Sequence, residues 1–310
     1  MVTALLFPGQ GSQCAGMGAG LARAYPAARR VFEEADEVLG ERLSHLLFEG
    51  SEDELTLTRN AQPAILVNSI AVLRALESLR PVEFAFAAGH SLGEWTALVA
   101  AGAIDFADAV RLVRLRGEAM QAAVPAGVGT MAAIIGIPTE VVEAVCAEAA
   151  GNQVCAAANH NGGGQVVIAG HAAAVDRAMA LAKARGAKRA VHLHVSAPFH
   201  CELMAPAAAA LADALAPVTV RDPRVPVVAN VDATPNRSGA RIKDLLVRQV
   251  TSPVRWEESV LRLAADGVDR GYELGSRAVL ASIIKRTVST LRVTTIGGPN
   301  EVQAFIESLG

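Results

Sequence analysis

Hydrophobic and polar positions follow two different periods along the chain, and these periods predict strands and helices in turn. Short apolar runs predict strands at Thr3–Phe7 and Glu83–Ala88. Apolar residues spaced three and four apart predict helices over Phe32–Leu39, Gln62–Leu79 and Phe106–Gln121. Because strands that alternate with helices favour a parallel sheet covered by helices, this part of the chain is predicted to be an α/β domain.

The pattern changes near Gly129 and returns to the first type after Pro198. Between these points the predicted order is βαββαβ, which is typical of a ferredoxin-like unit. Its elements are expected at 130–137, 139–149, 154–158, 165–169, 172–185 and 188–195, and the larger pattern resumes with elements at 203–215, 225–229, 242–250, 256–265 and 268–273. The predicted fold is therefore an α/β-hydrolase-like large domain with a parallel sheet, residues 1–127 and 197–310, carrying an inserted ferredoxin-like small domain, residues 128–196.

Composition narrows the classes of function. The chain has 310 residues and a net charge of −3 without blocks of Lys or Arg, so nucleic acid is not expected as its main partner. A stretch without charge, 122–139, contains Pro and Gly and should not span a membrane. The four cysteines form no C-x-x-C pair, which favours free thiols over disulfides or a metal site. With no basic signal segment at the start, a cytoplasmic location is expected.

The most informative segment joins the apolar run 84–88 to a predicted helix from Leu92 through a serine flanked by glycines, Gly89-His90-Ser91-Leu92-Gly93. This is the G-x-S-x-G spacing of a nucleophile elbow, in which a sharp turn leaves no room for a Cβ at either glycine and exposes the serine hydroxyl. Ser91 would then lie at a helix N-terminus, where free N–H groups can bind an oxyanion. The sequence thus predicts a nucleophilic serine.

Polar residues also occur on apolar faces of two predicted helices. Arg116 shares a face with Leu112, Val113 and Met120, where a charge is costly unless it meets a carboxylate. That carboxylate could belong to a substrate or to an internal Asp or Glu. Gln249 lies among Ile242, Leu245 and Leu246 on another helix, where a buried amide often serves only the core. His200 becomes informative only if it pairs with Ser91.

Eight segments in succession resemble the motifs of the malonyl-CoA:acyl carrier protein transacylases, a family related to the acyltransferase domains of polyketide synthases. The resemblance extends over essentially the whole chain, and the predicted small domain lies where that family has one. The segments are Phe7 to Gln13, Ala61 to Ala64, Gly89 to Glu94, Arg114 to Gly117, Ala158 to Asn161, Gln165 to Gly170, Ser196 to His200 and Ser252 to Trp256.

The resemblance implies roles for particular residues. Ser91 would be the nucleophile and His200 its general base, with the backbone N–H groups of Gln10 and Leu92 as the oxyanion hole. Arg116 would bind the malonyl carboxylate, so that its missing partner arrives with the substrate. Substrate-binding or supporting positions would be Gln62, His90, Asn159, Asn161, Phe199 and Gln249, the last giving a backbone carbonyl to the histidine in place of an acid.

The implied function is ping-pong transfer of a malonyl group from coenzyme A to the phosphopantetheine thiol of an acidic acyl carrier protein, as in fatty acid biosynthesis. No cofactor or metal is implied, because the coenzyme A thioester is a substrate. Two alternatives are an acyltransferase that supplies a polyketide synthase and a serine hydrolase. A third is a non-catalytic subunit that docks the carrier, but such a subunit should have lost Ser91, His200 or Arg116. A hydrolase triad would require an acid such as Asp176. Candidates for carrier docking are Lys188, Arg189, Arg277, Lys285 and Arg286.

Overall fold

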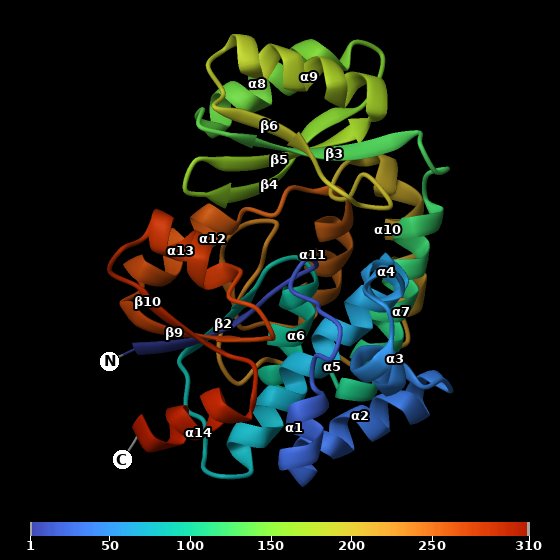
Figure 1. The fold of residues 1–310 in the computed structure, drawn as a ribbon. Helices are drawn as coiled ribbons and strands as arrows, with labels where there is room; N and C mark the ends of the chain where they lie inside the picture. Colours follow the sequence, from blue (N-terminus) through green and yellow to red (C-terminus); the bar gives the residue numbers. More distant parts are fainter. Residues whose placement is uncertain (1, 309–310) are drawn as a thin grey trace.

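A computed structural model describes residues 2–308 and contains two separate sheets (Figure 1). The larger has six strands in the order β10-β9-β1-β2-β7-β8, and every neighbouring pair is parallel except β7 with β8. Its strands are β1 (Val2–Phe7), β2 (Phe86–Gly89), β7 (Val227–Val228), β8 (Pro235–Asn236), β9 (Val268–Leu274) and β10 (Arg292–Ile296). The prediction of a parallel-rich α/β sheet is confirmed.

Helices surround this sheet, and one of them is central to the core. Helix α5 (Thr58–Glu77) is buried along most of its length because its apolar residues occur all round, unlike those of an amphipathic surface helix. The others are α1 (Ala19–Ala24), α2 (Pro26–Leu39), α3 (Leu43–Glu49), α4 (Glu52–Thr56), α6 (Leu92–Ala100), α7 (Phe106–Ala122), α10 (Ala205–Leu215), α11 (Gly239–Thr251), α12 (Trp256–Ala265), α13 (Leu280–Thr287) and α14 (Pro299–Ser308). We call this sheet and its helices the large unit.

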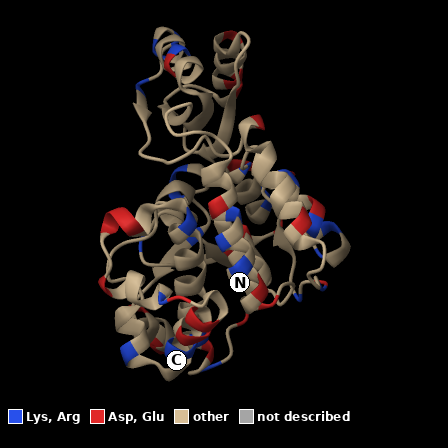
Figure 2. Ribbon diagram, turned by 90° about the vertical axis from the view of Figure 1, so that its right-hand side faces the viewer, with Lys and Arg blue, Asp and Glu red and all other residues tan. Residues whose placement is uncertain are grey.

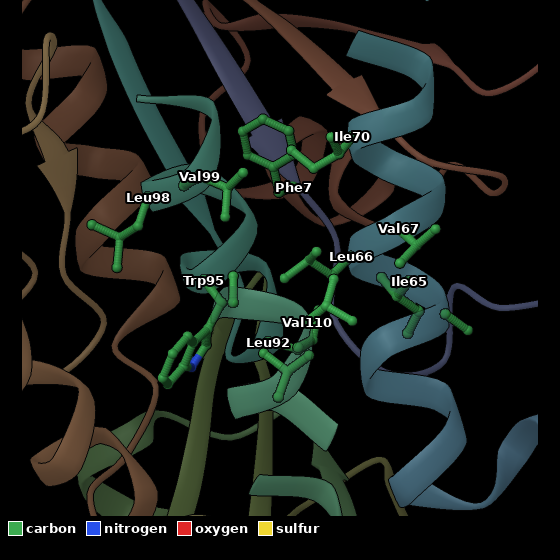
Figure 3. Packing of buried hydrophobic residues seen from close by; sticks show 14 of the residues in the cluster. Phe7, Ile65, Leu66, Val67, Ile70, Leu92, Trp95, Leu98, Val99 and Val110 are labelled. Atoms are coloured by element: carbon green, nitrogen blue, oxygen red, sulfur yellow. The ribbon is translucent and has the colours of Figure 1, made fainter. Parts of the chain in front are cut away.

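The main core lies where the large sheet meets α5, α6 and α7. Figure 3 shows Phe7 from β1, Leu66 from α5 and Trp95 from α6 in this core, and all three are fully buried. Helix α6 follows Ser91 directly. The packing of this helix therefore anchors the segment that presents the serine.

The smaller sheet forms a unit of its own, with α8 and α9 on its outer face (Figure 1). Its strands run in the order β4-β5-β3-β6 and all pairs are antiparallel. The chain order is β3 (Gly129–Ile135), α8 (Thr139–Ala150), β4 (Cys155–Gly162), β5 (Gln165–His171), α9 (Ala172–Ala184) and β6 (Arg189–His192). We call these elements the small unit. Their order agrees with the predicted βαββαβ pattern, and they enclose a second apolar core.

Several element bounds differ from the predicted ones for identifiable reasons. Strand β4 continues past Ala158 to Gly162, because Asn159, His160 and Gly162 continue the antiparallel pairing with β5. The segment expected to be one helix from Leu203 begins with a 3₁₀ turn, Glu202–Met204. The short helices α1, α3 and α4 were not predicted, since five to seven residues give little periodicity.

Candidate active site

Ser91 lies in the sharp turn between β2 and α6, as the motif predicts. Its backbone has φ 51° and ψ −105°, a conformation that is costly for a residue with a Cβ. A Cβ on Gly89 would lie 2.0 Å from the carbonyl of Gly93, and one on Gly93 would lie 2.0 Å from the Phe7 carbonyl oxygen. Both glycines are therefore required by close backbone approach, and the turn holds the serine at the carboxyl edge of the sheet.

His200 is the hydrogen-bond partner of the serine. Its Nε2 is 2.7 Å from Ser91 Oγ, and its Nδ1 is 2.8 Å from the backbone oxygen of Gln249. Because a carbonyl only accepts, Nδ1 bears the proton and Nε2 is free to accept from the serine hydroxyl. Burial and the positive charge of Arg116 lower the pKa of His200 to about 3, so the imidazole is neutral at pH 7.

Arg116, from α7, enters the same site with its charge uncompensated by any direct acid. Only 2% of the residue is exposed, and its guanidinium donates to three neutral oxygens. Nη1 is 2.6 Å from Gln62 Oε1, while Nη2 is 3.0 Å from Gln249 Oε1 and 3.2 Å from Ser91 Oγ. Burial lowers the pKa of Arg116 to about 10, which still leaves it positive at pH 7. The guanidinium is thus a buried cation beside the nucleophile.

Two residues of this site escaped the sequence analysis, Glu94 and Asn230. Asn230 accepts from the Ser91 N–H at 2.7 Å through Oδ1 and donates to the Gly89 carbonyl at 2.8 Å through Nδ2, so it braces the elbow. Glu94 Oε2 accepts from the Asn230 N–H at 2.9 Å and from Gln249 Nε2 at 2.7 Å. Every residue of α6 is buried, so an acid in this helix is anomalous, but the anomaly shows only once the structure is known.

A cavity of about 380 Å³ between the large and small units contains this constellation. Ser91, His200 and Arg116 line it together with Gln10 and Leu92, the predicted oxyanion-hole residues. Leu92 is the first residue of α6, where N–H groups have no partner within the helix. Of the remaining predicted residues, Gln62, His90, Asn159, Asn161 and Phe199 also line the cavity, whereas Gln249 lies behind Arg116 and His200.

His90 connects the two units across this cavity. Its Nε2 is 2.8 Å from Asn161 Oδ1 on β4, and Asn161 Nδ2 donates to Gln165 Oε1 at 3.1 Å. A backbone bridge between Asn159 and Val254 lies close by. Burial lowers the pKa of His90, which favours its neutral form. These contacts fix the position of the small unit over the serine.

The structure disfavours the hydrolase alternative at one specific point. Asp176, the acid that a triad would have used, lies 3.0 Å from His192 in the small unit. The Nδ1 atom of His200 is occupied by the Gln249 carbonyl instead. Within residues 2–308, no group of three or more metal-ligating side chains comes together, and no helix is long and apolar enough to cross a membrane.

A hydroxyl bound to a neutral imidazole in a strained strand-to-helix turn is the arrangement used by proteins with a serine nucleophile, and it lies here on a mixed α/β fold. Residues 4–306 match the model of the acyl transferase domain. The chain belongs to this acyl transferase domain family.

Proteins and solved structures similar to this chain match it over nearly its full length. The malonyl CoA-acyl carrier protein transacylase of Escherichia coli K12 is 50% identical over 304 residues, with 98% of each chain covered. The transacylase of Bacillus subtilis 168 is 49% identical over 308 residues, covering 99% of this chain and 96% of its own. Among solved structures, the acyl-carrier-protein S-malonyltransferase of Bartonella henselae has a TM-score of 0.97 at 48% identity, with both chains covered completely.

Another solved structure carries the same fold in a complex. It is a malonyl-transacylase bound to its type II polyketide synthase acyl-carrier protein, with a TM-score of 0.97 at 45% identity, covering 99% of this chain and all of that one. Such agreement confirms the family resemblance seen in the sequence motifs.

Proposed function

We propose that this protein transfers a malonyl group from coenzyme A to the phosphopantetheine thiol of an acyl carrier protein through an ester on Ser91. One observation carries the proposal: a buried guanidinium lies 3.2 Å from the nucleophilic oxygen and has only neutral partners. A substrate carboxylate would supply the missing negative charge. The names of the relatives, malonyl CoA-acyl carrier protein transacylases, support the same substrates.

The first half-reaction forms the ester. As the serine oxygen attacks the thioester carbonyl, its proton passes to Nε2 of His200, which becomes positively charged. The N–H groups of Leu92 and Gln10 stabilise the tetrahedral oxyanion. When the carbon–sulfur bond breaks, the coenzyme A sulfur takes the proton from His200 and leaves as a thiol.

The second half-reaction reverses these steps with another thiol. The pantetheine thiol gives its proton to His200 and attacks the ester carbonyl, and Ser91 leaves with that proton as the C–O bond breaks. Malonyl-serine must outlast competing attack by water. A narrow cavity, filled in part by the carboxylate on Arg116, reduces the room for a productive water. The chemistry needs no cofactor.

We infer the finer description of the fold and setting from the same features. The βαββαβ order with strands β4-β5-β3-β6 supports a ferredoxin-like small domain over residues 128–196, and the elbow on a parallel-rich sheet supports a hydrolase-like large domain over 1–127 and 197–310. A cytoplasmic location fits a protein acting on coenzyme A thioesters. A fatty acid carrier is our main proposal; a polyketide carrier is the alternative, favoured by the relative solved with one.

Intact-mass measurement tests the proposal. Malonyl-CoA should add one malonyl group to the protein, Ser91→Ala should remain unmodified, and a phosphopantetheinylated carrier should remove the group and acquire it. Loss of the ester to water at the same rate with or without the carrier would instead identify a hydrolase.

A further inference from the structure

Glu94 is a buried acid that the acyl-transfer chemistry does not use. It comes from the first turn of α6, three residues after the nucleophile, and only 2% of it is exposed. The carboxylate oxygen Oε2 accepts two hydrogen bonds, from Gln249 Nε2 and from the Asn230 N–H. Both donors belong to residues that contact the catalytic groups. An acid kept in such a costly position demands an explanation beyond packing.

The Gln249 amide links Glu94 to Arg116. Its Nε2 faces Glu94 at 2.7 Å, and its Oε1 faces Arg116 Nη2 at 3.0 Å. If the amide turned over, its oxygen would face the carboxylate and its NH₂ group would face the guanidinium, so both contacts would become repulsive. Nε2 also donates to the Ser91 carbonyl oxygen at 3.0 Å and to Asn230 Oδ1 at 3.2 Å. The contact with Glu94 is the shortest of these three and the only one to an acid, so Glu94 is the main group that fixes which end of the amide Arg116 meets.

This orientation decides where the guanidinium lies. Arg116 is held by Gln62 Oε1 on one nitrogen and by Gln249 Oε1 on the other. Both acceptors are needed to hold the guanidinium plane beside Ser91, because a long side chain held at one nitrogen retains freedom to rotate. A carboxylate binds an Arg fork in two-pronged geometry, which depends on that plane.

We propose that Glu94 is a positioning residue that sets the Gln249 amide and, through it, holds Arg116 in place for the malonyl carboxylate. This inference rests on the proposed malonyl transfer. Burial raises the pKa of Glu94 to about 7, while its hydrogen bonds from the Asn230 N–H and the Gln249 amide act to lower that pKa. Oε2 keeps a lone pair for each donor whichever protonation state the acid has, provided any proton is on Oε1.

The second hydrogen bond of Glu94, from the Asn230 N–H, affects all substrates alike. It supports the residue that binds the Ser91 N–H and the Gly89 carbonyl. Loss of this hydrogen bond should slow transfer of charged and uncharged acyl groups equally. The ratio of kcat/KM for malonyl-CoA to that for acetyl-CoA therefore isolates the effect of the other hydrogen bond, which leads through Gln249 to Arg116.

Two nearly isosteric variants separate the hydrogen bond from the volume of the side chain. Glu94→Gln keeps an acceptor oxygen for Gln249 and Asn230, whereas Glu94→Met fills the site without one. The malonyl-to-acetyl ratio should fall roughly 10- to 100-fold in Glu94→Met, the range expected for losing a hydrogen bond in a charged network, and should stay within about fivefold of wild type in Glu94→Gln. Should the Met variant fail to fold, Glu94→Ala replaces it.

Glu273→Gln is a matched control, since Glu273 is fully buried but binds the N–H groups at the start of α13. Its ratio should equal that of wild type. The positioning role is wrong if Glu94→Met keeps the wild-type ratio, or if Glu94→Gln loses as much of it as Glu94→Met. Absence of malonyl transfer in the wild type would instead refute the proposed function, so the two failures are distinguishable.

Discussion

At the scale of single residues, His200 is a base whose protonation is suppressed by its surroundings. Its pKa of about 3, against 6.5 for an ordinary histidine, means that the imidazole remains neutral through mildly acidic conditions. The first-turnover rate of Ser91 acylation should therefore show no loss with a midpoint near pH 6.5 when it is measured from pH 8 to 5 by rapid quench and mass spectrometry.

A loss of the acylation rate near pH 6.5 that persists in Glu94→Gln would contradict the neutral state of His200. Glu94 titrates in the same range, with a pKa of about 7, and must be separated from the histidine. Repeating the profile in Glu94→Gln removes that group. Any step that disappears in this variant belongs to Glu94.

Phe199 adjoins the catalytic histidine, is 8% exposed and lines the cavity. We expect it to crowd the carbon that carries the extra methyl group of methylmalonyl. Phe199→Ser should raise methylmalonyl use relative to malonyl by at most about 100-fold, because one methyl in a pocket is worth roughly 1–3 kcal/mol. Competition between the two thioesters measures this ratio. An unchanged ratio in a folded variant would exclude Phe199 from substrate selection.

The sequence could predict Ser91 from the elbow motif and single out Arg116 from its anomalous helix face, whereas His200 was identified through the family resemblance. It could not single out Glu94, since an acid in the first turn of a helix is ordinary at a surface. Its burial depends on Gln249, which is 155 residues later in the chain. Asn230 likewise shows its role only when the loop after β7 reaches the elbow. These partners are set by tertiary packing.

At the scale of elements, the β2–α6 turn depends on the absence of side chains at two positions. A Cβ on Gly93 would lie 2.0 Å from the Phe7 carbonyl oxygen, and neither backbone can yield without moving β1 or α6. Gly93→Ala should reduce the free energy of unfolding by about 3 kcal/mol or more, as overpacking against fixed backbone does. Urea denaturation followed by circular dichroism measures the change.

Gly20→Ala is the matched control for this turn. Gly20 lies in α1, where a Cβ would meet Pro299 at an ordinary 3.4 Å and alanine favours the helix. Its stability should equal or exceed that of wild type. Equal stability of Gly93→Ala and wild type would show that the elbow is looser than the geometry requires.

Long elements with a clear period were predictable from the sequence, and contact-dependent ones were not. Helix α7, expected over Phe106–Gln121, spans Phe106–Ala122. Strand β4 was expected to end at Ala158, but its extension carries Asn161 to His90. Antiparallel pairing of the added residues with β5 produces that extension, and hydrophobic periodicity does not contain this information.

At the scale of the whole molecule, the site lies where the two units meet, and two basic residues lie beside it on α13. Leu280 and Ile283 of α13 line the cavity, as does Val279 just before this helix, while Lys285 and Arg286 on the helix are exposed. Elsewhere Lys and Arg are interspersed with Asp and Glu over the ribbon (Figure 2). An acidic carrier would therefore find favourable charge on α13 near the cavity opening.

Reversing one of these charges should weaken carrier docking without affecting chemistry. Arg286→Glu should raise KM for the carrier several-fold, more at low salt than at high salt, and leave transfer to free pantetheine unchanged. Arg30→Glu makes the same charge change on α2, whose residues do not line the cavity, and serves as control. Equal KM values for the two variants would exclude α13 from docking.

The central claim is that Arg116 selects malonyl by pairing with its carboxylate, and substrate discrimination in Arg116→Ala tests it most directly. We predict that kcat/KM for malonyl-CoA falls by about two to four decades, the roughly 3–5 kcal/mol lost when a buried ion pair is broken, while kcat/KM for acetyl-CoA is retained. Arg116→Lys should recover little, because an ammonium lacks the two-pronged fork. An equal fall for both substrates in a folded variant would contradict the claim and make Arg116 a structural residue.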